Sequence, residues 1–341
     1  MITRDGPPDV TQSQVSGLRP FAHLTPDAVL DAAEAVGLEP DGHVFALNSY
    51  ENRVYRVGRI DAPPLVLKFY RAGRWSDAQI LEEHAFATEL ATAEIPVVAP
   101  ILLGESTLRR HGEFRLAAFP MQAGGAPDLD RPEARELLGR TLGRIHALGA
   151  LRPFLVRPSL SGERLGARAR RTVLAASTLP PHMRTRYEQV SARLLAQVLE
   201  LTGERGDWRA IRLHGDCHLG NILWQPQGPV FVDLDDCLNG PAIQDLWMFL
   251  AGTPDERSGQ WQELMKGYRQ FATFEHRQVR LIEALRAVRM LNHAAWIAER
   301  WTDPAFPRAF PWYGEARFWE QHVLDLLEQS QLLDEPSAFE L

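Results

Sequence analysis

The stretch that most restricts how this chain can fold runs from residue 213 to residue 236. It reads as a short strand, a loop with Asp216 and Asn221 five residues apart, a hairpin, and a second acidic loop that begins at Asp233. The hairpin folds the second loop back beside the first, so two carboxylates and one amide converge on one point. Phosphoryl transfer from ATP needs such a set. One carboxylate orients the attacking hydroxyl, and oxygen ligands hold Mg²⁺ against the phosphates.

A lysine in an apolar strand supplies a cation for the same chemistry. Only two of the 37 Lys and Arg residues are lysines, Lys68 and Lys266, so a lysine inside an apolar run needs a reason. Lys68 lies in the strand 65–70, where its ammonium is costly without an anionic partner. The alternative is an edge-strand lysine whose ammonium reaches water. The next helix opens with a capping box at 76–79 and carries Glu83 on its apolar face, which makes Glu83 the predicted ion-pair partner.

The order of the expected elements predicts an α+β chain with two lobes. A flexible lead-in at 1–24 is followed by an N-lobe at 25–121, a small antiparallel sheet with one inserted helix. A mainly helical C-lobe is expected at 122–341. The N-lobe elements are helices at 26–36 and 76–93 and strands at 44–47, 53–59, 65–70, 100–103 and 114–119. In the C-lobe we expect strands at 211–213, 222–224 and 230–234, with helices dominating after residue 244.

These motifs together resemble the aminoglycoside phosphotransferase and choline kinase superfamily, which shares the protein kinase fold. The resemblance rests on His-x-Asp-x₄-Asn at 214–221, the downstream Asp233 and the upstream Lys68. It implies a bilobal kinase-like fold that binds ATP and Mg²⁺. It also implies that Lys68 grips the phosphates while paired with Glu83.

The same resemblance assigns roles to the acidic loops. Asp216 becomes the catalytic base, and Asn221 and Asp233 become the Mg²⁺ ligands. Asp235 either helps to hold a second Mg²⁺ or braces its loop. The alternative for the whole set is a pair of solvated turns. We expect Asp245, further along the chain, to anchor the helix that follows it.

The chain departs from ordinary protein kinases in the loop between its first two strands. No GxGxxG pattern lies there, and residues 48–52 stand in its place. By resemblance Ser49 contacts ATP, whereas its alternative is turn formation alone, because Asn and Ser favour turns. No obvious activation loop follows the segment 233–235 that replaces the DFG motif.

A closer resemblance covers most of residues 25–320 and points to the bacterial stress response kinase A family. That family implies a cytoplasmic Ser/Thr protein kinase with a protein hydroxyl as acceptor. A small-molecule kinase acting on an amino alcohol, aminoglycoside or sugar shares every motif, and a non-catalytic scaffold is the remaining alternative. The stretches that carry this resemblance are 48–55, 68–71, 80–84, 213–224, 233–236, 240–248 and 301–307.

Composition excludes several other classes of protein. The net charge of −7 argues against nucleic-acid and membrane-surface partners, since both favour basic patches. No apolar stretch approaches the roughly 20 residues of a membrane span. Two cysteines are too few for a disulfide framework, so a reducing cytoplasm is expected. We also expect a monomer. Cys217, beside Asp216, is either a redox sensor or a small buried thiol, and we favour the buried thiol.

Overall fold

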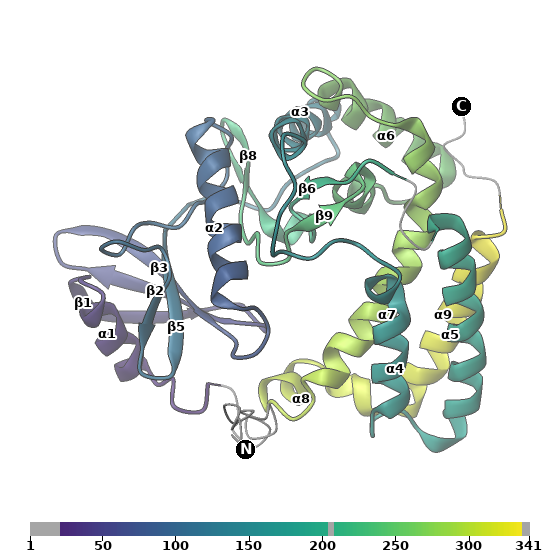
Figure 1. The fold of residues 1–341 in the computed structure, drawn as a ribbon, viewed down its shortest axis with the longest axis horizontal. Helices are drawn as coiled ribbons and strands as arrows, with labels where there is room; N and C mark the ends of the chain where they lie inside the picture. Colours follow the sequence, from purple (N-terminus) through teal and green to yellow (C-terminus); the bar gives the residue numbers. More distant parts are fainter. Residues whose placement is uncertain (1–20, 204–207, 336–341) are drawn as a thin grey trace, which may run out of the picture.

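A computed structural model describes residues 21–203 and 208–335. Its N-terminal part is a five-stranded antiparallel sheet of order β1-β2-β3-β5-β4, and its C-terminal part is mainly helical (Figure 1). The two parts correspond to the expected N-lobe and C-lobe. The elements of the N-lobe are α1 (Pro26–Ala35), β1 (Pro40–Leu47), β2 (Arg53–Arg59), β3 (Ala62–Tyr70), α2 (Asp77–Thr92), β4 (Arg109–His111) and β5 (Phe114–Pro120).

Local capping explains where the two N-lobe helices begin. The Thr25 side chain accepts a hydrogen bond from the Ala28 backbone N–H at the start of α1. At the start of α2, Ser76 and Gln79 form the predicted capping box. Helix α2 buries the face that carries Glu83 and Ile80, and it crosses the sheet next to β3 (Figure 1). The ends of both helices therefore follow from local sequence.

Three details of the expected secondary structure are wrong. Residues 100–103 form no strand. Pro100 has no N–H to donate, and Ile101 makes only one backbone hydrogen bond to Ala118 of β5. The edge strand β4 instead uses the polar residues 109–111, which show no apolar alternation. Strand β8 ends at Phe231 rather than at residue 234.

The predicted lead-in at 1–24 lies outside the described residues except for its last four positions. Among those four, Leu24 is buried in the core of the N-lobe. The Phe21 ring lies 4.8 Å from the Arg53 guanidinium carbon. Residues 21–24 therefore pack against the N-lobe.

The C-lobe holds two short antiparallel strand pairs among packed helices. Strands β6 and β9 pair antiparallel, as do β7 and β8, and the second pair is the hairpin expected between the two acidic loops. None of the helices within 21–203 and 208–335 is long and apolar enough to cross a membrane. The C-lobe elements are α3 (Pro132–Gly149), a π-helical turn at Glu163–Ala167, α4 (Arg168–Ala175), α5 (Pro181–Thr202), β6 (Ile211–Leu213), β7 (Ile222–Gln225), β8 (Gly228–Phe231), β9 (Leu238–Gly240), α6 (Pro254–Tyr268), α7 (Ile282–Glu299), α8 (Ala305–Ala309) and α9 (Ala316–Leu332), with short 3₁₀ turns at Leu219–Asn221, Ala242–Asp245, Trp247–Phe249, His276–Leu281 and Pro311–Gly314.

Candidate active site

The loop after β6 is held by a buried carboxylate from a distant part of the chain. Asp245 is fully buried, and it accepts hydrogen bonds from the backbone N–H groups of His214 (2.7 Å) and Gly215 (2.9 Å). His146 of α3 lies 3.2 Å from the same carboxylate. The expectation that Asp245 anchors the helix after it is therefore wrong. Its carboxylate instead fixes the start of the loop that carries Asp216.

His214 and Gly215 bring the two acidic loops together. The His214 ring Nε2 lies 2.9 Å from the carbonyl of Val232, the residue immediately before Asp233, so this histidine holds the two loops together. Gly215 has φ +89°, and a Cβ there would lie 2.1 Å from the Asp236 carbonyl oxygen. Only glycine fits such a close approach at a positive φ. The first loop therefore packs directly against the second.

Asp216 projects into a partly open site. Its Oδ1 accepts a hydrogen bond of 2.8 Å from Arg289 of α7, and its Oδ2 lies 3.4 Å from His218 Nε2. Burial would raise the pKa of Asp216, but the His218 interaction and the Arg289 charge outweigh it and lower the pKa well below the ordinary value. About a third of the side chain is exposed. Asp216 is thus an ionised, accessible carboxylate.

Asn221 and Asp233 offer oxygen atoms suited to a hard cation. The Asn221 side-chain amide donates to the Asp216 carbonyl (3.0 Å), and within the described chain its Oδ1 accepts no hydrogen bond. Asp233 has φ +59°, and its side chain is 52 % exposed. Across residues 21–203 and 208–335, no group of three His, Cys, Asp or Glu side chains could hold a metal. Two protein oxygens fit Mg²⁺, which commonly keeps waters and phosphate oxygens as its other ligands.

Lys68 lies among three carboxylates rather than one. Its ammonium is 2.8 Å from Asp233 Oδ1, 3.2 Å from Asp235 Oδ1 and 4.0 Å from Glu83 Oε1. Burial would lower the pKa of Lys68, but the three carboxylates raise it well above the ordinary value. The predicted partner Glu83 is in ion-pair range but is the most distant of the three. Glu82, the residue before Glu83, accepts hydrogen bonds from the backbone N–H groups at 155–157.

In this structure Asp235 braces its loop through buried ion pairs. Its side chain is almost fully buried, and it is ion-paired with Arg74 as well as with Lys68. The Asn52 side chain donates to its Oδ2 (3.1 Å). The neighbouring Asp236 pairs with the second Arg74 nitrogen at 2.7 Å. Arg74 therefore ties the segment between β3 and α2 to the second acidic loop.

The Ser49 hydroxyl closes the turn at 48–52. It donates to the Asn52 carbonyl and accepts from the Val54 N–H, both at 3.2 Å. Asn52 in turn accepts from the Arg71 N–H at 3.1 Å. In this structure Ser49 therefore acts through turn geometry, which fixes the shape of the loop that stands where other kinases cover phosphates.

Sequence reasoning missed a clamp that joins this loop to the C-lobe. Glu51 receives a 2.6 Å ion pair from Arg300 and a 2.7 Å hydrogen bond from Trp296 of α7. Arg71 pairs with Asp303 (2.8 Å) in the segment before α8, and α8 lies at the bottom centre of Figure 1, between the N-lobe and α7. The stretches 48–55 and 301–307 both carry the family resemblance, and the sequence analysis assigned no role to 301–307.

Cys217 is a buried thiol, as favoured. Its side chain has no exposed surface, and burial raises its pKa well above the ordinary value. Cys237 is equally buried and also unpaired. A thiolate is disfavoured at both positions, so neither has the environment of a redox sensor.

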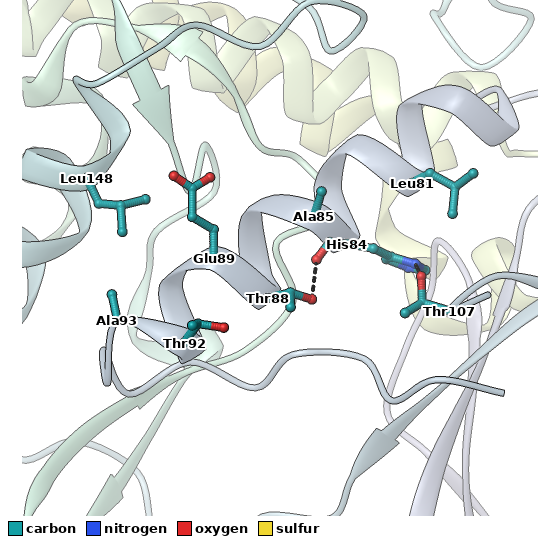
Figure 2. A pocket seen from close by; sticks show the side chains of 9 residues that line it. All are labelled: Leu81, His84, Ala85, Thr88, Glu89, Thr92, Ala93, Thr107 and Leu148. Atoms are coloured by element: carbon teal, nitrogen blue, oxygen red, sulfur yellow. Dashed lines mark hydrogen bonds between the residues drawn. The ribbon is translucent and has the colours of Figure 1, made fainter. Parts of the chain in front are cut away.

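A hollow of about 620 Å³ lies on a face of α2 other than the one that carries Glu83 (Figure 2). Leu81, Ala85 and Thr88 of α2 line it, together with Thr107 and Leu148. None of the residues that the sequence assigns to ATP, metal or catalysis lines this hollow. It is therefore separate from the cleft that holds Lys68.

Comparison with known proteins agrees with this geometry. Residues 44–282 match the model of the phosphotransferase enzyme family. The chain is 40% identical over 316 residues to stress response kinase A of Escherichia coli strain K12, covering 93% of this chain and 95% of that protein. It is 41% identical, with the same coverage, to the serine/threonine protein kinase RdoA of Salmonella typhimurium strain LT2.

Solved structures place the fold among bilobal kinases. Amicoumacin kinase hAmiN, in complex with AMP-PNP, Ca²⁺ and Ami, superposes with a TM-score of 0.69 at 18% identity, covering 92% of this chain and 96% of that one. Choline kinase from Cryptosporidium parvum Iowa II gives 0.61 at 12% identity, covering 91% and 96%. The chain belongs to the phosphotransferase enzyme family and, within it, to the stress response kinase A family.

Proposed function

We propose that this chain is a cytoplasmic, ATP- and Mg²⁺-dependent protein kinase that phosphorylates Ser or Thr hydroxyls. The observation that carries the proposal is the 2.8 Å pair between Lys68 and Asp233, which faces a braced loop bearing the ionised Asp216. A lysine for phosphates, a carboxylate for metal and a carboxylate for the acceptor are the parts that phosphoryl transfer requires. The unpaired, buried cysteines fit a reducing compartment.

Each residue has a defined task in this proposal. Asp216 accepts the proton of the acceptor hydroxyl as its oxygen bonds to the γ-phosphorus, and the bond from that phosphorus to the ADP oxygen breaks. Lys68 releases Asp233 in part and contacts the phosphates of ATP. Asn221 Oδ1 and the Asp233 carboxylate would hold Mg²⁺, which would neutralise phosphate charge. Catalysis then comes mostly from positioning and electrostatics.

The choice of a protein acceptor is supported by the name of one relative, a serine/threonine protein kinase. The alternative is a small-molecule acceptor, because the structural neighbours are named for amicoumacin and choline. Those neighbours are less than 25% identical to this chain and support the fold alone. The residues assigned to ATP and Mg²⁺ keep the same tasks under either acceptor.

The proposal is tested by following label from γ-labelled ATP with Mg²⁺ present. Acceptors are casein, myelin basic protein and a panel of small alcohols and amines, and Asp216→Ala serves as the matched inactive control. Label on protein Ser or Thr that depends on Asp216 is the expected result. Label on a small acceptor alone would refute the protein kinase and keep the phosphotransferase. Equal labelling by Asp216→Ala would refute the assigned catalytic residue.

A further inference from the structure

An exposed stripe of α7 runs along the acceptor side of the cleft. Arg289, Asn292 and His293 are exposed and Trp296 is partly buried, and the four follow one another at helical spacing on α7. One end of the stripe touches Asp216 through Arg289, and the other touches Glu51 through Trp296. The stripe therefore spans the distance from the catalytic carboxylate to the loop at 48–52. An acceptor that reaches Asp216 along this face meets these four side chains, none of which is a carboxylate.

Arg289 is hydrogen-bonded to Asp216 Oδ1, the oxygen that an acceptor hydroxyl needs. Its guanidinium donates to Asp216 Oδ1 at 2.8 Å, and 48 % of its side chain is exposed. A hydroxyl that gives its proton to Asp216 competes for the same carboxylate. When the hydroxyl arrives, Arg289 loses part of its ion pair and is left beside the bound acceptor. An anionic group on the acceptor would then replace Asp216 as its partner.

A second arginine adds positive charge nearby. The side chain of Arg164 is half-buried, and within the described residues it has no carboxylate in ion-pair contact. Asn292 of the stripe donates to the Arg164 carbonyl at 3.2 Å, which places this segment against α7. Asp236 lies close enough to both Arg164 and Asp216 for their charges to act on one another. A cationic acceptor would meet both arginines, whereas the nearby Asp236 carboxylate is already paired with Arg74.

We propose that Arg289, supported by Arg164, is a specificity-determining residue that selects acceptors carrying an anionic group beside the accepting hydroxyl. This inference rests on the proposed function, and within it the acceptor is a Ser or Thr in an acidic segment. Consecutive Cα atoms are about 3.8 Å apart, so the acidic residue stands within about two positions of the hydroxyl. A small hydroxy acid presents the same chemistry, and the experiment separates the two sources.

The test compares peptides that differ only in the residues flanking a central Ser. Asp, Asn or Lys fills the flanking positions, and kcat/KM is measured with ATP and Mg²⁺ for the full chain and for its variants. We expect the wild type to prefer the Asp peptide over the Lys peptide by at least about tenfold, equivalent to ~1.4 kcal/mol. Arg289→Glu should reverse the preference, and Arg289→Lys should keep its direction. A role limited to holding Asp216 would lower all rates together and leave the ratio unchanged.

A charge change elsewhere in the C-lobe supplies the matched control. Arg193 of α5 is 63 % exposed and pairs with Asp334, so Arg193→Glu makes the same change of charge on a surface formed by other helices. This variant should keep the wild-type ratio. Thermal unfolding of every variant shows that a changed ratio does not reflect lost folding. A wild-type ratio near one, or a ratio that Arg289→Glu leaves unaltered, overturns the proposal.

Small acceptors separate this inference from the proposed function. Glycerate and ethanolamine are assayed beside the peptides as an anionic and a cationic alcohol. Label on glycerate but on no peptide would refute the protein kinase and support the role of Arg289. A preference of the wild type for ethanolamine over glycerate would overturn that role, whether or not Arg289→Glu keeps the preference.

Discussion

The two sides of the proposed active site, for nucleotide and for acceptor, are built on different principles. On the nucleotide side, Lys68, Glu83 and Asp235 are almost fully buried and belong to a network that also includes Arg74. On the acceptor side, Asp216 and Arg289 form a partly exposed pair. Buried charges must be compensated where they lie, so the nucleotide side leaves little freedom of sequence. The exposed pair can change at low cost, which makes the acceptor side the place where specificity can vary.

The largest effect is expected from removing the acceptor-side carboxylate. Asp216→Ala should lower turnover by roughly 10²–10⁴, because proton transfer by a positioned side chain contributes that much. The free energy of unfolding should change little, since Asp216 is partly exposed. Label transfer and urea unfolding measure the two quantities. Turnover close to the wild type would show that this side of the cleft does not carry the chemistry.

On the nucleotide side, the main effect of a substitution is expected on the free energy of unfolding. Lys68→Met removes the cation that three carboxylates share, and within the described chain only Asp235 keeps another ion pair, with Arg74. The variant should lower the free energy of unfolding by about 3 kcal/mol. The only other lysine is the matched control, because Lys266 is 72 % exposed and pairs with Glu136. Lys266→Met should cost less than ~1 kcal/mol in urea unfolding. Equal costs for the two variants would remove the contrast between buried and exposed charges.

Protonation of Glu83 should make the stability of the nucleotide side depend on pH. Burial raises the pKa of Glu83 from its ordinary value of 4.5 to about 7. Between pH 4.5 and 7 the folded chain therefore keeps a proton on Glu83 that the unfolded chain loses. The contribution of this proton to the free energy of unfolding is fully present below pH 4.5 and is lost as the pH rises through 7. As the pH rises from 4.5 to 7, the free energy of unfolding of the wild type should decrease relative to that of Glu83→Gln. A difference that stays constant with pH would contradict the burial of this group.

The clamp between the lobes should give the smallest effect. Glu51→Gln keeps the shape of the side chain but removes the charge that faces Arg300 and Arg71. The loop at 48–52 would then be held less firmly, and we expect the KM for ATP to rise about fivefold, or ~1 kcal/mol, with kcat nearly unchanged. Steady-state kinetics at saturating acceptor measure it. A fall in kcat alone would mean that the clamp serves the acceptor side.

The features that the sequence predicted well are those set by local spacing. Asp216, Asn221 and Asp233 lie on two loops joined by one hairpin, so their proximity follows from a short stretch. Lys68 stood out because lysine is rare in this chain. The capping box of α2 is a pair of local hydrogen bonds and was predicted correctly.

The features that were missed depend on contacts between distant segments. Glu51 and Arg300 are 249 residues apart, and Arg289 reaches Asp216 from a helix 73 residues further along the chain. Such pairs leave no periodicity in the sequence. The role of Asp245 was misread for the same reason, because its partners belong to a loop 30 residues earlier.

The division of labour across the cleft is tested most directly by titrating ATP with Mg²⁺ into Asp216→Ala and Asp233→Asn. The account predicts that Asp216→Ala binds ATP within about threefold of the wild type, and that Asp233→Asn binds it at least about tenfold more weakly when Mg²⁺ is present. Calorimetry measures both dissociation constants. Weak binding by Asp216→Ala together with unchanged binding by Asp233→Asn would contradict the assignment of the two sides.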